Sequence, residues 1–260
     1  MFSDALVTEF IKLRRSKVTW ATLAAFSIAP CAIALFMWIV REPGRAAQLG
    51  LLGTKANLAG IQATWPAFLS MLTLIVGVAG MLMLAFVVAY VFGREYAEGT
   101  AKNLLALPVA RHWIVLAKFV VVLAWWLVLV AAIVAESFAI GALLALPGFS
   151  AGLALATLRD VVLVACAAYL LAPPIAWITV LGRGYLPAIG FALATLALGD
   201  VFSHTGWAAW FPWSVVPLFV GAVGARQTSV AAGSVVVVAL TFVLGIAATI
   251  AQLQYADNAQ

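Results

Sequence analysis

The sequence predicts an all-α polytopic membrane protein with six transmembrane helices. Of its 260 residues, 66% are hydrophobic and only 9% are charged, and the mean hydropathy is +1.16. An ordinary soluble domain is nearer half apolar and a quarter charged. Uncharged runs separate the charged residues, and most reach the roughly 20 residues that a helix needs to cross a bilayer. Composition therefore excludes a soluble domain.

The gaps between charges predict the elements in order. Phe2, Leu6, Phe10 and Leu13 recur at helical spacing, which predicts an amphipathic interfacial helix over residues 2–16 along the inner leaflet. A frayed basic leader is the alternative. The spans follow in a single transmembrane domain that covers residues 1–260, at about residues 18–40, 66–92, 114–146, 160–182, 185–201 and 229–251.

The segment before the last span is unusual. From His204 to Arg226 it contains Trp207, Trp210 and Trp213 together with two prolines, so it is too broken for a straight span. Tryptophan favours the headgroup layer. We predict a short re-entrant segment that dips into the outer leaflet and returns, with its broken backbone covered by protein. A plain aromatic belt is the alternative.

The charge pattern predicts orientation rather than nucleic-acid binding. A nucleic-acid binder gathers its basic residues on one face of a soluble module, whereas here they lie at span ends. With the N-terminus inside, nine of the fourteen are cytoplasmic and five are outer (Arg41, Arg45, Lys55, Arg159, Arg226). The positive-inside rule therefore predicts that both termini are cytoplasmic. Both cysteines, Cys31 and Cys166, fall inside spans, so we expect neither a disulfide nor a metal motif.

Two motifs bear on enzymatic chemistry. The stretch "GFSAG", Gly148–Gly152, matches the G-x-S-x-G of a nucleophile elbow, which would give a membrane-embedded serine hydrolase built on Ser150 and His204. That elbow requires a strand before it and a helix after it, whereas Pro147 and Gly148 favour an outer turn of small residues. The G-x-x-x-x-G-K-[ST] phosphate loop is absent from the sequence, so we expect no ATP hydrolysis by this chain alone.

Glu136 is the one acid in the middle of a predicted span. Ionisable groups inside a membrane are costly and count as functional candidates. Three roles stay open: a polar contact with another helix or subunit, contact with a transported substrate, and proton coupling. The last would suit an ion-coupled secondary transporter.

The connection between the second and third spans, "VFGREYAEGTAKNLLALPVARHW", is rich in polar residues. Arg94 with Glu98, and Glu98 with Lys102, are pairs four residues apart, which supports a helix over residues 94–107. Gly99 interrupts it, at a cost of about 1 kcal/mol relative to alanine. A charged helix with a glycine break and an apolar continuation favours a docking surface, and a solvated turn is the alternative.

The stretch "FGREYAEGTAKNLLALPVAR" resembles the segment after the second span in ABC-2-type transporter permeases, where F-x-x-E-x-x-x-G-T-x-[KR]-x-L-L-x-x-P-[VI]-x-R recurs. The resemblance extends over the whole chain. The stretch "FPWSVVP" is most similar to the branch that contains bacitracin and lantibiotic self-protection permeases and other small drug exporters.

This resemblance implies a permease that pairs with a second copy, or with a related permease, and docks on separate ABC ATPase subunits. ATP and Mg would bind only to those ATPase subunits, and this chain would hold no cofactor or metal. The expected function is export of a lipophilic or amphipathic cargo, such as a drug, a peptide antibiotic or a lipid-like molecule, across a bacterial or archaeal cytoplasmic membrane. The resemblance assigns ATPase coupling to six residues of the connection, flanked by Arg111: Glu95, Tyr96, Glu98, Gly99, Thr100 and Lys102.

Overall fold

The computed structural model describes residues 2–51, 61–101, 109–221 and 232–255, and no strand occurs within these ranges. It confirms the predicted fold class, because six helical segments are long and apolar enough to cross a membrane. They are Lys17–Arg41 (α2), Trp65–Ala97 (α4), Arg111–Leu143 (α6), Ala151–Leu181 (α7, Ala151–Leu170, with α8, Pro173–Leu181), Tyr185–Ser203 (α9) and Ala232–Tyr255 (α11).

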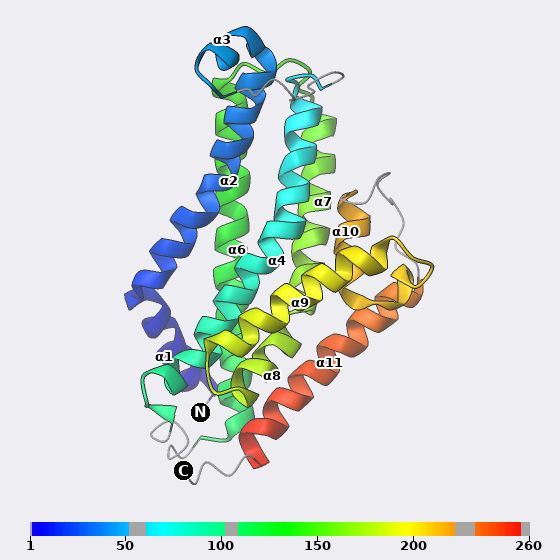
Figure 1. The fold of residues 1–260 in the computed structure, drawn as a ribbon. Coiled ribbons are helices and arrows are strands. Elements are labelled where there is room, and N and C mark those ends of the chain that lie inside the picture. Colours follow the sequence, from blue (N-terminus) through cyan, green and yellow to red (C-terminus); the bar gives the residue numbers. More distant parts are fainter. Residues whose placement is uncertain (1, 52–60, 102–108, 222–231, 256–260) are drawn as a thin grey trace.

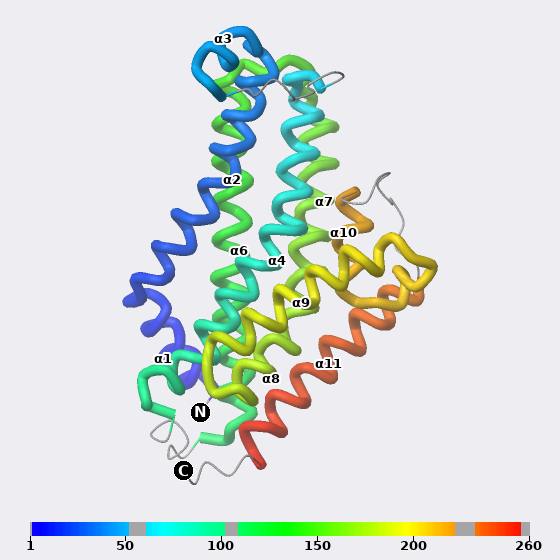
Figure 2. The backbone as a smooth tube through the Cα atoms, in the orientation of Figure 1, coloured from blue at the N-terminus to red at the C-terminus, as the bar shows by residue number. Residues whose placement is uncertain are grey.

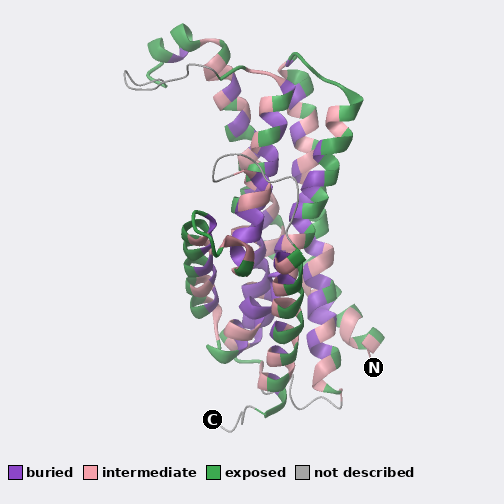
Figure 3. Ribbon diagram, turned by 90° about the vertical axis from the view of Figure 1, so that its right-hand side faces the viewer, coloured by how far each residue is buried: buried purple, intermediate pink, exposed green. Residues whose placement is uncertain are grey.

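Helices α4 and α6 form the centre of the bundle (Figure 1). Buried residues make up 56% of the most apolar stretch of α4 and 61% of that of α6, against 22% in both α2 and α11. Figure 3 shows this as buried ribbon along the inside and exposed ribbon at the margins. The peripheral helices α2, α9 and α11 therefore present large apolar faces away from the bundle.

The two ends of the bundle differ (Figures 1 and 2). Helix α1, Phe2–Arg15, lies at one end together with the last turns of α4 and α11. We call residues 94–100, the last turn of α4 and the turn after it, the elbow, and this end of the bundle the elbow end. Helix α3, Pro43–Gln48, lies at the opposite end, which we call the α3 end. Helix α1 packs against α6, and its place along the inner leaflet stays a prediction.

Gly80 of α4 allows close packing at the centre of the bundle. A Cβ atom on Gly80 would lie 2.9 Å from the ring of Trp126, and Trp126 is 1% exposed. Its indole N–H donates to the carbonyl oxygen of Ala165 at 3.0 Å. Small residues let membrane helices approach closely, so Gly80 lets α4 receive an aromatic ring that also binds α6 to α7.

The helix that contains the fourth span begins before the predicted start of that span at about residue 160. Helix α7 begins at Ala151, where the hydroxyl of Ser150 accepts a hydrogen bond from the backbone N–H of Leu153 at 3.2 Å. The pair Arg159 and Asp160 therefore lies inside a helix rather than before one. The side chain of Arg159 is 71% exposed, whereas that of Asp160 is 8% exposed, and the Arg159 guanidinium lies 3.0 Å from the buried Asp160 carboxylate.

The predicted helix over residues 94–107 is interrupted near its start. Its first residues are the last turn of α4, which ends at Ala97. Gly99 has a φ of +68°, and the N–H groups of Gly99 and Thr100 bond back to Tyr96 and Glu95 at 3.3 and 2.8 Å. This left-handed glycine cap ends the helix. Residues 102–107, including Lys102, lie outside the described residues.

The segment before the last span consists of short helices: η1 (Ala208–Trp210), η2 (Pro212–Ser214) and α10 (Val215–Val220). Helix α10 packs against α4, α7 and α9, and η2 packs against α9, so protein covers much of the broken backbone. Trp213 is 9% exposed and meets the ring of Phe191 edge-on at 5.7 Å, whereas Trp210 is 62% exposed. The depth to which this segment enters a bilayer stays a prediction.

Candidate functional site

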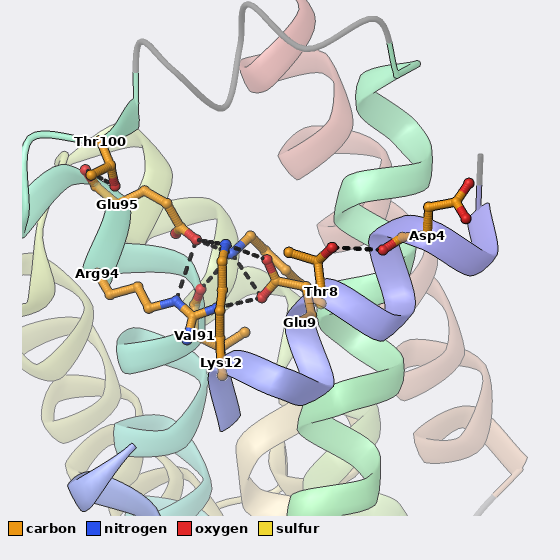
Figure 4. A network of polar contacts seen from close by, with 9 residues as sticks. Asp4, Thr8, Glu9, Lys12, Val91, Arg94, Glu95 and Thr100 are labelled. Carbon is orange, nitrogen blue, oxygen red and sulfur yellow. Dashed lines mark hydrogen bonds and ion pairs between the residues drawn. The ribbon is translucent and has the colours of Figure 1, made fainter. Parts of the chain in front are cut away.

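Three helices meet at the elbow end around five charged side chains, which we call the charge cluster (Figure 4). Helix α1 contributes Glu9 and Lys12, the last turn of α4 contributes Arg94 and Glu95, and the first turns of α6 contribute Lys118. Glu9, Arg94, Glu95 and Lys118 are between 3% and 6% exposed. The cluster therefore joins three segments that lie far apart in the sequence.

Glu9 receives contacts from all three helices. Its Oε2 lies 2.6 Å from the guanidinium of Arg94 and 3.4 Å from Nζ of Lys118. Its Oε1 lies 2.8 Å from Nζ of Lys12, one turn further along α1. A buried charge is tolerated when it is paired and hydrogen-bonded, so these contacts hold α1 against the ends of α4 and α6.

Glu95 points into the same cluster. Its Oε1 lies 2.8 Å from Nζ of Lys118, 3.2 Å from Nζ of Lys12 and 3.3 Å from Nε of Arg94. Lys118 also donates to the carbonyl oxygen of Val91 at 2.8 Å. The four-residue spacing predicted that Arg94 pairs with Glu98. In the structure, Arg94 pairs with Glu9 and Glu95 instead. The Glu95 carboxylate faces the interior instead of offering a surface to a partner.

The other side of the elbow is open. Glu98, Gly99 and Thr100 are exposed, and Tyr96 is half-buried. A Cβ atom built on Gly99 would meet no other atom of the described residues within 4 Å. The elbow therefore has two faces: an inner one fixed by the charge cluster and an outer one, residues 98–100, available for contact. The flanking Arg111 faces α11 instead, where its guanidinium donates to two carbonyl oxygens at the end of that helix.

An apolar groove of about 410 Å³ lies between α2, α4 and α9. Among the described residues that line it, Thr22, Tyr90 and Tyr185 carry polar groups and the rest are alanine, valine, isoleucine, methionine or phenylalanine. Such a surface can hold hydrocarbon or aromatic groups.

Glu136 lies apart from this site, between α6 and α2. Its Oε1 is 2.8 Å from the hydroxyl of Ser27, and its Oε2 is buried without a hydrogen-bond partner among the described residues.

The elements needed for a serine hydrolase do not come together. The hydroxyl of Ser150 caps α7, and no strand precedes it within the described residues. His204 Nδ1 lies 2.8 Å from the backbone oxygen of Asp200, at the end of α9. No group of three potential metal ligands of the His, Cys, Asp or Glu type occurs in the described part of the chain.

Sequence reasoning did not include Glu9, Lys12 and Lys118 in the candidate site. Lys118 lies inside the predicted span 114–146, and a lysine there should have prompted a search for a buried acid. Glu9 gave a weaker signal, because acids are ordinary on the polar face of an amphipathic helix. Glu9 lies 85 positions from Arg94, and Lys118 lies 23 positions from Glu95 and 109 from Glu9, so these contacts have no local pattern.

Comparison with known proteins agrees with this architecture. The family model of the ABC-2 family transporter protein matches residues 5–199. The bacitracin transport permease protein BCRB of Bacillus licheniformis is 30% identical over 183 residues, which cover 70% of this chain and 88% of that protein. No solved structure matches the chain. This multi-pass membrane protein belongs to the ABC-2 family and is a membrane permease of an ABC transporter.

Proposed function

We propose that the chain is the permease of an ATP-driven exporter in which two permeases act with two separate ABC ATPase subunits. Family membership implies an ABC ATPase partner. The observation that carries the proposal further is the two-faced elbow: Glu98, Gly99 and Thr100 are exposed, while Glu95 beside them is anchored to α1 and α6. A force applied to the exposed face would therefore reach three helices.

The apolar groove supports a lipophilic or amphipathic cargo. Its walls belong to α2, α4 and α9, the first, second and fifth spans. A relative is named for the transport of bacitracin, so an amphipathic peptide antibiotic is a fitting first candidate. ATP would close the ATPase pair and shift the equilibrium between a groove that holds cargo and one that releases it outward.

A second copy would cover the faces that α2 and α9 leave open. Trp20 and Ile28 of α2, and Leu186 and Leu193 of α9, are between 51% and 81% exposed. These faces flank the groove, so a homodimer would enclose it. The positive-inside rule supports a cytoplasmic elbow end in the bacterial or archaeal cell membrane, where an ATPase would have access to ATP.

Co-expression with the cognate ATPase tests this proposal. We expect the purified permease to hydrolyse no ATP, the co-purified complex to hydrolyse it, and Glu98→Lys to lower the yield of complex, because a reversed charge at an interface mainly alters association. Glu42→Lys, at the α3 end, is the matched control and should leave the yield unchanged. Hydrolysis by the permease alone, or equal effects of the two reversals, would contradict the proposal.

A further inference from the structure

Tyr90 lies one turn before Arg94 on α4, at the junction of several elements. Its hydroxyl is 2.9 Å from the hydroxyl of Ser16. Ser16 is the single residue between α1 and α2, and it caps α2 by accepting the N–H of Val18 at 3.0 Å. Tyr90 therefore contacts the junction between α1, which contributes to the charge cluster, and α2, which lines the groove.

The ring of Tyr90 makes the remaining contacts. It stacks on the ring of Tyr185 at the start of α9, with centroids 6.4 Å apart and planes 16° from parallel. The guanidinium carbon of Arg94 lies 5.9 Å from its centroid. Tyr90 and Tyr185 both line the groove. One side chain thus contacts the charge cluster, the α1/α2 junction, α9 and the groove.

We propose that Tyr90 is the positioning residue through which the elbow sets the width of the groove. This inference rests on the proposed function. A displaced elbow moves Arg94, Arg94 moves the ring beneath it, and the ring is joined by its hydroxyl to α2 and by its face to α9. These are two opposite walls of the groove. Packed side chains and hydrogen bonds that have two arrangements can carry coupling between sites, and Tyr90 supplies contacts that join the elbow to the groove.

A fluorophore in the groove tests this role directly. Ala25 lines the groove, so Ala25→Cys, in a chain that also carries Cys31→Ala and Cys166→Ala, accepts bimane there. The permease is assembled with its ATPase in nanodiscs, and bimane emission is followed as ATP with vanadate is added. We expect an emission change in this reference protein. In Tyr90→Phe the ATP concentration that gives half of the emission change should shift about fivefold, the effect of losing one hydrogen bond that is made in only one of the two states.

Two further variants separate this role from a merely structural one. Ser16→Ala removes the same hydrogen bond from the other side, so Tyr90→Phe should add nothing in that background. Tyr169→Phe removes a comparable bond, donated to the Phe119 carbonyl oxygen at 3.0 Å, and should leave the emission response unchanged.

The outcomes distinguish the two proposals. A reference protein that fails to bind the ATPase refutes the proposed function and the role of Tyr90 with it. If the reference protein binds the ATPase and shows the emission change, but Tyr90→Phe responds in the same way as Tyr169→Phe, only the role of Tyr90 is refuted. Additive effects of Tyr90→Phe and Ser16→Ala also refute it, because the two hydroxyls would then act separately.

Discussion

Replacing Lys118 with methionine removes the ammonium group at the centre of the charge cluster while keeping most of the side-chain volume. Lys118 is 3% exposed and its Nζ lies 2.8 Å from Glu95 and 3.4 Å from Glu9. Without it, two buried carboxylates share Arg94 and the partly exposed Lys12. Removing one partner from a buried ion pair costs about 3–5 kcal/mol, because it leaves an uncompensated charge.

Thermal denaturation of the detergent-purified permease measures this effect. A loss of that size should lower the midpoint by roughly 10 °C for a chain of this length. Arg45→Met is the matched control, since Arg45 forms a 3.1 Å ion pair with Glu42 but its side chain is 68% exposed. An exposed pair contributes at most about 1 kcal/mol, so this variant should stay close to the unaltered protein.

A second substitution shows whether the uncompensated charge is the cause. Glu95→Gln in the Lys118→Met background removes one of the two carboxylates and should restore more than half of the lost stability. Equal midpoints for Lys118→Met and Arg45→Met, or no recovery in the double variant, would refute the reasoning that the cluster holds α1, α4 and α6 together.

The remaining predictions concern the elbow, the orientation and the segment before the last span. Because Gly99 has a φ of +68° and no described atom within 4 Å of its Cβ position, Gly99→Asn should preserve ATPase binding. Gly99→Leu, with a left-handed penalty of about 1–2 kcal/mol and added bulk, should weaken it in the co-purification assay. A cysteine at Ser3 should react with impermeant maleimide only from the cytoplasm, and cysteines at Gln48 and Ser150 only from outside; one residue reacting from the wrong side breaks the topology. Trp213→Ala should destabilise the protein by about 3–5 kcal/mol in thermal denaturation, as a buried aromatic does, and unchanged stability would show that the segment is not packed as described.

The six spans could be predicted from the long uncharged runs in the sequence, because a membrane span rarely carries a charged side chain in its middle. A charged side chain at the membrane centre is costly, so gaps between charges mark spans. The same rule did not locate the start of α7, because Arg159 lies inside that helix with its side chain 71% exposed and paired with Asp160. Charge gaps locate spans well and locate helix ends poorly, because arginine can extend its charge beyond its own backbone position.

The two faces of the elbow could not be predicted. Glu95 and Glu98 are both acids on the same short stretch, and nothing local separates them. Lys118, 23 positions away, draws Glu95 inward, while the left-handed turn at Gly99 leaves Glu98 outside. Long-range pairing of this kind depends on how helices pack, so the sequence could indicate a docking segment without showing which of its residues face outward.

Photo-crosslinking tests the central claim most directly, namely that the outer face of the elbow docks the ATPase. A photoreactive amino acid at position 98 should give an adduct with the ATPase on irradiation of the assembled complex, because Glu98 is exposed at the elbow. The same amino acid at position 48, exposed at the α3 end, should give none. Adducts from position 48 and none from position 98, in a complex that still hydrolyses ATP, would contradict the account.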